Sequence, residues 1–402
     1  MAQKKAPYLK VVEPPADSGK PPKKPKKKIR FVRHGSLKQP LVFVILFALA
    51  VCGTYLLVKN QVYGQARKAS GYESDISDTN NYIQFSDGVI RYNKNGVVFL
   101  NNKNEEQWMH PAQIKNPVVE VRKDVFAVAD RGGNTILVFS EDGLKGEIET
   151  TLPIEQISVS NQGIVSAILK NESSPQIFSY DSAGNILVEH KITLSTTGYP
   201  INLEISDDGN LLAVSYLNTQ GAVLKSRVMY YNFGEQGKQK TDNIVTSDEY
   251  KGSVMAELFF MGNERSVVVG DSSFVIYKGN EVPEKMEEIT LDQEIKSVFH
   301  SDKYIGFILL NAEKSGYEVR LYDQSGNQVI SRAIEGEYRH VKLDGDEILM
   351  FDSNRCCIMT VTGITKFLGD IKLDALEMFR ARGINKYFVM GTDELRVIYL
   401  TK

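Results

Sequence analysis

The feature that most constrains this chain is an internal repeat, in which a short apolar or aromatic run is followed by a tight turn. The run occurs eight times, at residues 97–100, 136–139, 176–180, 228–231, 274–277, 319–322, 358–361 and 395–399. The glycines of six successive turns lie 41, 50, 45, 47 and 37 residues apart, namely Gly143, Gly184, Gly234, Gly279, Gly326 and Gly363. A repeat of about 40–50 residues is typical of a β-propeller, in which each repeat forms one four-stranded blade.

The segments between these runs are also typical of strands. From Asn81 onward, short β-rich segments alternate with Gly, Asp and Asn turns, and no long stretch keeps the 3.6-residue period of a helix. Seven innermost strands are predicted around residues 119–122, 157–160, 201–206, 255–260, 295–300, 338–343 and 376–380. A second strand is predicted after each of them, at residues 126–130, 164–169, 211–216, 266–270, 304–310, 348–351 and 386–391. The predicted fold class of residues 81–402 is therefore all-β, a β-propeller.

The eight runs predict eight blades. The last repeat contains only three strands before Lys402, and we expect residues 82–85 (YIQF) to supply its fourth strand. Closing the ring in this way leaves no open sheet edge. If residues 82–85 belong instead to the first blade, the terminal segments merge, and the alternative is a ring of seven blades.

A second constraint comes from residues 41–58, LVFVILFALAVCGTYLLV, which carry no charge. A helix rises about 1.5 Å per residue, so a helix of this length spans about 27 Å, close to the hydrocarbon thickness of a bilayer. We predict one transmembrane helix at residues 41–58 and a linker at residues 59–80. The alternative is a cleaved signal peptide, which requires a shorter basic region and an apolar core of about 7–15 residues.

The charge distribution predicts how this helix is oriented. Residues 1–40 hold 12 Lys and Arg against Glu13 and Asp17, a net charge of +10, whereas the rest of the chain has 36 basic and 48 acidic residues, a net charge of −12. Lys and Arg beside a membrane helix stay on the cytoplasmic side. We therefore expect a single-pass protein of the cell membrane, with a cytoplasmic N-terminus and the propeller outside.

The tail at residues 1–40 contains seven of the 13 prolines in the chain, and its Pro/Lys-rich composition predicts disorder. Anionic lipid is its expected partner, because each basic residue near such a surface adds about 1 kcal/mol of attraction. Docking of a cytoplasmic protein is the alternative. Nucleic acid is not an expected partner, because a membrane accounts for a basic tail beside an apolar helix.

Three segments carry a resemblance to known propellers. Residues 205–215 (ISDDGNLLAVS) resemble the inner hairpin of tryptophan-aspartate-repeat and quinoprotein-like propellers, although the Trp-Asp dipeptide is absent and Trp108 is the only tryptophan. Residues 82–108 (YIQFSDGVIRYNKNGVVFLNNKNEEQW) and 125–139 (VFAVADRGGNTILVF) resemble a family of unknown function from anaerobic Gram-positive bacteria. Members of that family have a short cytoplasmic tail, one membrane helix and an outside propeller. The resemblance implies this architecture and location, and it implies no functional residues.

The sequence does not predict a metal site. The five histidines are scattered, and no two have the four-residue spacing of helical metal ligands. His300 and His340 lie at the ends of equivalent inner strands and are interpreted as separate hydrogen-bonded residues. The acidic segments at residues 207–210 and 344–346 are interpreted as hairpin turns, because a calcium loop needs carboxylates at alternate positions and a later Glu.

The sequence also does not predict a catalytic or cofactor site. Cys356 and Cys357 have no base near them in the sequence, and neighbours in a strand point to opposite faces. Residues 131–134 (RGGN) resemble a phosphate loop but are not followed by a helix, so a hairpin turn is predicted. The aromatic residues that end the repeated runs are interpreted as packing between blades. We therefore expect no catalytic residues, no cofactor, no metal and no enzyme activity.

The leading functional hypothesis is a membrane-anchored, extracytoplasmic scaffold that binds a protein or another ligand in the cell envelope. Its expected partners are the lipid bilayer and either envelope proteins or cell-wall glycan, because the loops of a propeller form two recognition faces. One alternative is a transmembrane sensor that signals through a cytoplasmic partner. Another is an envelope enzyme of quinoprotein or glycosidase type. A contact surface is expected at the longest insertion, residues 236–253, together with the loop at residues 195–200.

Overall fold

The computed structural model describes residues 38–73, 80–171, 174–219, 223–311, 316–391 and 394–402, so most of the predicted disordered tail lies outside the described residues. The chain divides into two units, with the boundary after Lys59. The first contains helix α1 (Lys38–Lys59), in which Leu41, Phe43 and Phe47 are among many exposed apolar side chains. No helix in the described part of the chain combines the length and the apolarity that a membrane span requires.

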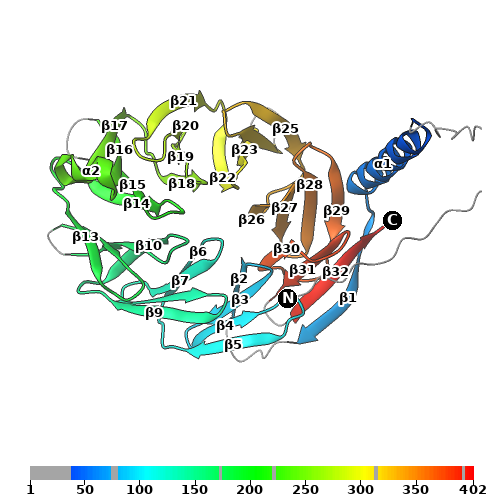
Figure 1. The fold of residues 1–402 in the computed structure, drawn as a ribbon, viewed down its shortest axis with the longest axis horizontal. Coiled ribbons are helices and arrows are strands. Elements are labelled where there is room, and N and C mark those ends of the chain that lie inside the picture. Colours follow the sequence, from blue (N-terminus) through cyan, green and yellow to red (C-terminus); the bar gives the residue numbers. More distant parts are fainter. Residues whose placement is uncertain (1–37, 74–79, 172–173, 220–222, 312–315, 392–393) are drawn as a thin grey trace, which may run out of the picture. The chain divides into compact units, whose positions relative to one another are not determined.

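The second unit, residues 60–402, is an eight-bladed β-propeller (Figure 1), as predicted. Each blade is a four-stranded antiparallel sheet, and in blades 1–7 the four strands are consecutive in the sequence. Blade 1 contains β2 (Asn81–Phe85), β3 (Gly88–Asn93), β4 (Gly96–Leu100) and β5 (Glu106–Pro111). Blade 2 contains β6 (Pro117–Val121), β7 (Val125–Asp130), β8 (Thr135–Ser140) and β9 (Gly143–Glu149). Blade 3 contains β10 (Ile154–Val159), β11 (Val165–Leu169), β12 (Gln176–Tyr180) and β13 (Ile186–Lys191).

Blade 4 contains β14 (Tyr199–Ile205), β15 (Leu211–Asn218), β16 (Lys225–Asn232) and β17 (Ile244–Lys251), with the short helices α2 (Glu235–Lys238) and η1 (Thr241–Asn243) inserted before β17. Blade 5 contains β18 (Glu257–Met261), β19 (Arg265–Val269), β20 (Ser273–Lys278) and β21 (Glu284–Thr290). Blade 6 contains β22 (Glu294–His300), β23 (Tyr304–Asn311), β24 (Gly316–Asp323) and β25 (Gln328–Ile334). Blade 7 contains β26 (His340–Asp344), β27 (Glu347–Asp352), β28 (Arg355–Thr360) and β29 (Thr365–Asp370). Blade 8 contains β30 (Glu377–Arg380), β31 (Lys386–Met390), β32 (Glu394–Thr401) and the N-terminal strand β1 (Gln65–Glu73).

The strand that closes the ring differs from the prediction. β1 pairs antiparallel with β32, from Gln65 opposite Thr401 to Glu73 opposite Glu394 (Figure 1). Residues 82–85 lie in β2, the first strand of blade 1, so the prediction that they complete the last blade was wrong. The prediction of a linker throughout residues 59–80 was also wrong. An outermost strand needs little apolar surface, and between Gln65 and Gly71 only Ala66 is even partly buried. Its polar sequence therefore resembles that of a linker.

The connections between strands are tight turns where the sequence predicts them. Gly209 (φ +73°) and Gly345 (φ +61°) adopt the left-handed backbone that their hairpins require. The Asp208 carboxylate accepts a hydrogen bond from the backbone N–H of Asn210 at 3.1 Å, which braces the first of these turns. The two acidic segments interpreted as hairpin turns are therefore confirmed as turns.

A β-bulge recurs in the outer half of the ring. In seven blades the pairing of the third strand with the fourth strand shifts register near the end of the third strand. Examples are the shifts at Val138/Phe139 and Ile276/Tyr277. A bulge increases the local twist, and this one adjoins the repeated aromatic positions. In blade 8 the outer pair shifts at Lys68/Ser70 instead. That pair has no hairpin connection, because its two strands come from opposite ends of the propeller.

The core is divided among the eight interfaces between neighbouring blades. Each interface has its own apolar cluster, and alternate residues of one strand face different neighbours. Cys356 belongs to the cluster between blades 7 and 8, whereas Cys357 belongs to the one between blades 6 and 7. This confirms that the two adjacent thiols point to opposite faces of β28.

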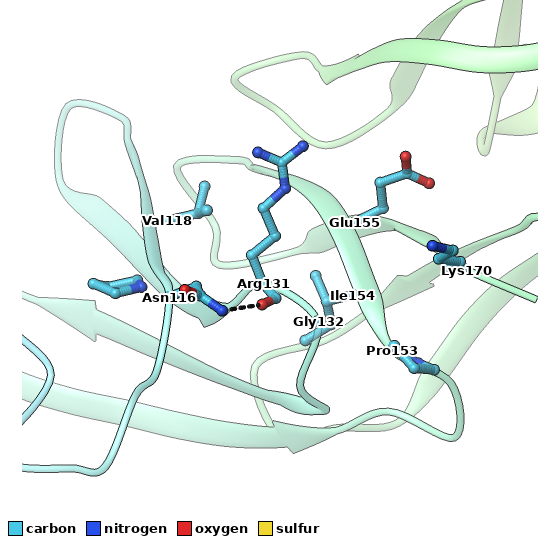
Figure 2. Close-up of a pocket in the computed structure, with 9 residues that line it drawn as sticks. Asn116, Val118, Arg131, Gly132, Pro153, Ile154, Glu155 and Lys170 are labelled. Atoms are coloured by element: carbon cyan, nitrogen blue, oxygen red, sulfur yellow. Dashed lines mark hydrogen bonds between the residues drawn. The ribbon is translucent and has the colours of Figure 1, made fainter.

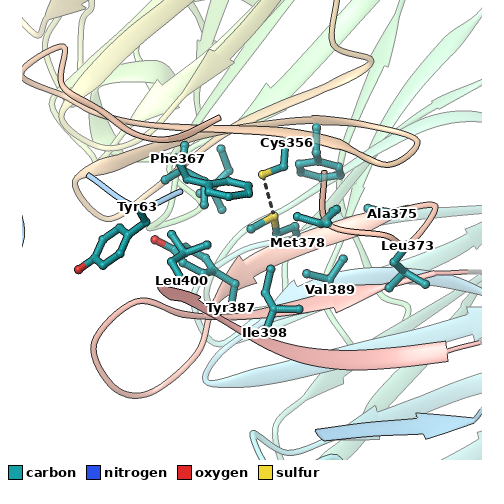
Figure 3. Packing of buried hydrophobic residues seen from close by; sticks show 14 residues of the cluster. Tyr63, Cys356, Phe367, Leu373, Ala375, Met378, Tyr387, Val389, Ile398 and Leu400 are labelled. Carbon is teal, nitrogen blue, oxygen red and sulfur yellow. Dashed lines mark hydrogen bonds between the residues drawn. The ribbon is translucent and has the colours of Figure 1, made fainter. Parts of the chain in front are cut away.

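The interface between blades 7 and 8, which we call the closing seam, also contains Tyr63 from the start of the propeller (Figure 3). Tyr63 is 6% exposed and packs in the apolar cluster there, and its backbone N–H donates to the carbonyl of Lys366 at 2.7 Å. Its hydroxyl accepts a hydrogen bond from Asn385 Nδ2. Beside this cluster, the ammonium of Lys366 pairs with Glu347, and both side chains are almost fully buried. Tyr387 donates its hydroxyl hydrogen to Glu347 Oε2 at 2.8 Å.

Candidate functional site

A groove crosses blades 2, 3 and 4 at the ends of the sheets where the first strands begin. It consists of two pockets, of about 640 Å³ and 300 Å³, which share Val118, Arg131 and Glu155. The larger pocket is also lined by Asn116, Pro117, Gly132, Pro153, Ile154 and Lys170 (Figure 2). The smaller is also lined by Gln156, Ile168, Tyr199, Pro200 and Ile201. We call this feature the ring-face groove.

Backbone hydrogen bonds hold the floor of the ring-face groove. Asn116 and Arg131 are joined twice: the N–H of Arg131 donates to the carbonyl of Asn116 at 2.9 Å, and Asn116 Nδ2 donates to the carbonyl of Arg131 at 3.2 Å (Figure 2). Gly132 N–H donates to the carbonyl of Ile154 at 2.8 Å, which ties blade 2 to blade 3. The segment at residues 131–134 is thus the hairpin connection predicted from the sequence, and it also forms a wall of the groove.

The charged side chains of the groove are available to a ligand. Arg131 and Lys170 are exposed, and neither has an ion pair with any residue that the structure describes. Glu155 Oε2 accepts a hydrogen bond from the hydroxyl of Tyr199 at 2.6 Å. Burial, with the neighbouring Glu155 carboxylate, raises the pKa of Tyr199 to about 12, so its hydroxyl stays protonated and keeps donating at neutral pH. The groove thus offers two cations, one oriented carboxylate and an apolar floor.

The opposite ends of the first strands carry a different set of charges, which face one another around the centre of the ring. Arg122 of blade 2 pairs with Glu204 of blade 4, and Ser158 of blade 3 donates to the same carboxylate. Lys123 lies 3.2 Å from Asp207 of blade 4 and 3.2 Å from Asp302 of blade 6. Blades 2 and 6 lie on opposite sides of the ring, so this contact spans its centre. These charges neutralise one another, so the centre of the ring offers a ligand fewer uncompensated charges than the ring-face groove does.

Burial disfavours the charged form of two groups in this central network. Burial and the nearby Glu204 carboxylate raise the pKa of Glu120 well above its usual range. Burial, together with the Arg122 guanidinium, lowers the pKa of His300 to about 4. The ring of His300 stacks on Phe259 with 3.8 Å between centroids. Its role is thus accounted for by packing.

The structure does not bring the two candidate histidines together. His300 is the last residue of β22, whereas His340 is the first residue of β26 and stacks on Phe351 of its own blade. The two side chains lie at opposite ends of equivalent inner strands, so the prediction that they are separate residues is confirmed. Among the described residues, no three of His, Cys, Asp or Glu gather in a way that would hold a metal ion.

The expected contact surface at residues 236–253 and 195–200 is partly regular structure. Residues 244–251 form the fourth strand of blade 4, so the insertion proper is α2 and η1. The two segments do approach each other, because Thr197 and Asp242 line one pocket. Tyr199 and Pro200 line the ring-face groove instead. Whether either surface contacts a partner stays a prediction.

Sequence reasoning missed Arg131, Glu155 and Lys170 as groove residues. They lie in or beside connections of ordinary composition, and only the neighbouring blade gives them a common space. The repeated aromatic positions are confirmed as packing residues at Phe139 and Tyr277, which are fully buried. Tyr231 is buried as well, but it also lines a pocket.

These features define a class of protein: an eight-bladed β-propeller with a groove on one ring face and no gathered metal ligands among its described residues. The model of DUF5711, a family of unknown function, matches residues 59–400. The chain therefore belongs to this family. No curated protein sequence matches the chain.

Several solved structures are similar to this chain at low sequence identity. BamB from Moraxella catarrhalis is similar with a TM-score of 0.53 at 11% identity, over 84% of this chain and 100% of that chain. A putative 6-phosphogluconolactonase from Bacteroides fragilis has a TM-score of 0.45 at 13% identity, over 74% and 96% of the two chains. The Pan2 WD40 domain of Neurospora crassa has a TM-score of 0.44 at 8% identity, over 71% and 90%. The similarity to BamB concerns the fold alone.

Proposed function

We propose that this protein is a binding scaffold whose ring-face groove takes up an extended segment of a partner protein. The observation that carries the proposal is the groove itself, two pockets across three blades that share lining residues and whose two cations have no carboxylate partner among the described residues. Its floor is fixed by hydrogen bonds between blades, so little ordering is needed before binding. A scaffold role of this kind involves binding without catalysis.

The chemistry of the groove indicates what the partner segment presents. Arg131 and Lys170 suit a carboxylate or backbone carbonyls, and Arg131 can bind a carboxylate through two parallel hydrogen bonds. Glu155 suits a donor such as a backbone N–H. Val118 and Ile154 supply an apolar surface for one side chain between these polar contacts. An extended protein segment offers all three kinds of group, whereas a neutral glycan lacks the carboxylate and the apolar side chain.

The test is site-specific photocrosslinking in the native cells. A photoreactive residue at Tyr199 lies in the groove, and one at Lys278 of blade 5 is the control, because that side chain is exposed away from it. We expect a discrete crosslinked protein from position 199 only. The double variant R131E/K170E should reduce the yield at least about tenfold, as expected for the loss of two charge contacts.

The matched control for charge is the double variant K278E/R382E, which reverses two exposed cations that have no ion pair among the described residues. It should leave the yield unchanged. Equal yields from positions 199 and 278, or equal losses in both charge variants, would overturn the proposal.

We further propose that α1 anchors the propeller to the cell membrane, with the basic tail in the cytoplasm and the propeller outside. The support is the uncharged run of residues 41–58, whose described side chains are largely exposed, with Phe43 at 74% and Phe47 at 72%. The basic tail before it would fix the orientation. Alkaline extraction of membranes should leave the full chain in the pellet, and extracellular protease should digest the propeller of intact cells. Release at alkaline pH, or protection from protease, would contradict this arrangement.

A further inference from the structure

A second pocket lies between blades 3 and 4, beside β13, the outermost strand of blade 3. Its volume is about 430 Å³, and we call it the rim pocket. Strand β13 contributes His190, strands β15 and β16 contribute Tyr216, Met229 and Tyr231, and the η1 insertion contributes Asp242. It shares no lining residue with the ring-face groove. An inference about it is therefore independent of the proposed function.

His190 is the unusual member of this pocket. The residue is 7% exposed, and its Nε2 atom has no hydrogen-bond partner among the described residues. An unpaired buried polar atom costs about 1–3 kcal/mol, and a hydrogen-bond donor on a ligand in the pocket would offset that cost. Burial lowers the pKa of His190 to about 4, against a smaller opposite effect of the Asp242 carboxylate. The imidazole is thus neutral at physiological pH, and one of its nitrogens is a hydrogen-bond acceptor.

Aromatic rings and a methionine thioether form much of the remaining wall of the rim pocket. The ring of Tyr231 lies 4.3 Å from that of His190, centroid to centroid. The hydroxyls of Tyr231 and Tyr216 are hydrogen-bonded to each other at 2.7 Å, and Met229 Sδ lies 3.4 Å from the Tyr231 hydroxyl. Because these hydroxyl groups are hydrogen-bonded to each other, they need no further hydrogen bond from a ligand. A ligand would instead contact the faces of the aromatic rings. Such faces attract cations.

The charge at the mouth is negative. Asp242 is exposed and has no ion pair or hydrogen bond with another described residue through its carboxylate. Glu189 also lines the pocket, and Lys191 lies 3.7 Å from its carboxylate and offsets it. The uncompensated group is therefore Asp242, so an anion is disfavoured.

We propose that the rim pocket binds a small organic ammonium ion. Its N–H groups donate to a His190 ring nitrogen and to the Asp242 carboxylate, and its methylene groups pack on Tyr231 and Met229. A primary amine satisfies both polar groups at once, which neither a quaternary ammonium nor an alcohol does. The ammonium group belongs either to a free amine or to a lysine side chain of another protein.

The test uses the full chain in detergent micelles with isotope-labelled histidine, since the chain has only five histidines. Titration with pentylamine should shift the ring signals of His190 in a saturable way, whereas 1-pentanol, its neutral counterpart, should not. Nα-acetyl-lysine methyl ester tests the side-chain source in the same assay. Saturation by pentylamine alone assigns the site to free amines, and saturation by both allows a lysine side chain.

Two variants make the result specific. D242N removes the charge of an exposed side chain without changing its size and should weaken pentylamine binding about threefold to tenfold, the loss expected for a charge-assisted contact near solvent. E284Q, which neutralises an exposed carboxylate on blade 5 that has no ion pair among the described residues, should leave binding unchanged. Equal shifts with pentylamine and 1-pentanol, no shift with any probe, or equal affinities for the wild type and D242N would overturn the proposal.

Discussion

Two interfaces of the same ring solve the problem of packing blade against blade in different ways. In the closing seam, between blades 7 and 8, an apolar cluster lies beside an ion pair whose two side chains are almost fully buried. In the interface between blades 3 and 4, the apolar cluster stops short of the rim and leaves a pocket of about 430 Å³. In the first interface Glu347 has several partners, whereas in the second the Nε2 atom of His190 has none among the described residues.

The contrast follows from what each interface has to do. The closing seam borders blade 8, in which β1 pairs with β32 although no hairpin connects the two strands. Tyr63 lies just before β1 and packs in the closing seam, so side-chain contacts there help to hold the N-terminal strand in place. The interface between blades 3 and 4 holds no strand from the other end of the propeller, and it leaves space and a polar atom without a partner among the described residues. The comparison predicts that polar substitutions are costly in the closing seam and mild at the rim.

The largest effect is expected from Glu347→Ala. It leaves the ammonium of Lys366 buried without a counter-charge, and breaking such a pair from one side costs about 3–5 kcal/mol. Chemical denaturation monitored by circular dichroism of the full chain in detergent should show this loss. The double variant E347L/K366M removes both charges and should recover most of it. A loss below about 1 kcal/mol for E347A would show that the pair does not hold the seam.

The next effect is expected from Tyr63→Ala, which removes a ring that is 6% exposed from the closing cluster (Figure 3). Truncation of a large buried side chain costs about 2–5 kcal/mol, so we expect about 3 kcal/mol in the same denaturation assay. Tyr63→Phe keeps the ring and loses only the hydrogen bond from Asn385, so about 1 kcal/mol is expected. Equal losses for both variants would assign the contribution to the hydroxyl rather than to packing.

Much of this architecture could be predicted from the sequence, because the third strand of most blades contains a run of residues that are buried on both faces and must be apolar. The turn glycines mark the same period, and together they predict eight blades. Strand β1 could not be predicted, because it is outermost and polar. Arg131 was recognised as a turn residue, yet its place in the groove depends on Ile154 of the next blade. His190 carries no signal at all, since an unpaired nitrogen is a property of the packed neighbours and not of the sequence.

A third effect concerns acid sensitivity at the rim. Burial lowers the pKa of His190 to about 4, below the value of about 6.5 expected in the unfolded chain. Above pH 6.5 the imidazole is neutral in both states and contributes no pH dependence. Between pH 6.5 and 4 the unfolded chain binds a proton that the folded chain does not. The free energy of unfolding therefore falls as the pH is lowered, with a slope of up to about 1.4 kcal/mol per pH unit.

His190→Gln should therefore flatten the stability profile between pH 6.5 and 4, measured as the free energy of unfolding at half-unit steps. His300→Gln should flatten it as well, because burial lowers the pKa of His300 to about 4. The two effects should add, since the residues lie in different interfaces. An unchanged slope in the His190 variant would mean that the rim pocket does not keep its histidine neutral.

The smallest effect is expected from Asp242→Asn, the counterpart at the rim of the change at Glu347. Its side chain is exposed and has no described ion pair, and surface substitutions of this kind usually change stability by less than about 0.5 kcal/mol. The same variant should nonetheless weaken ammonium binding. If neutralising Asp242 costs as much stability as removing Glu347, both carboxylates hold their interfaces and the contrast between the two fails. If it costs nothing while binding is weakened, the space at the rim is kept for a ligand, because the fold does not need the charge that faces it.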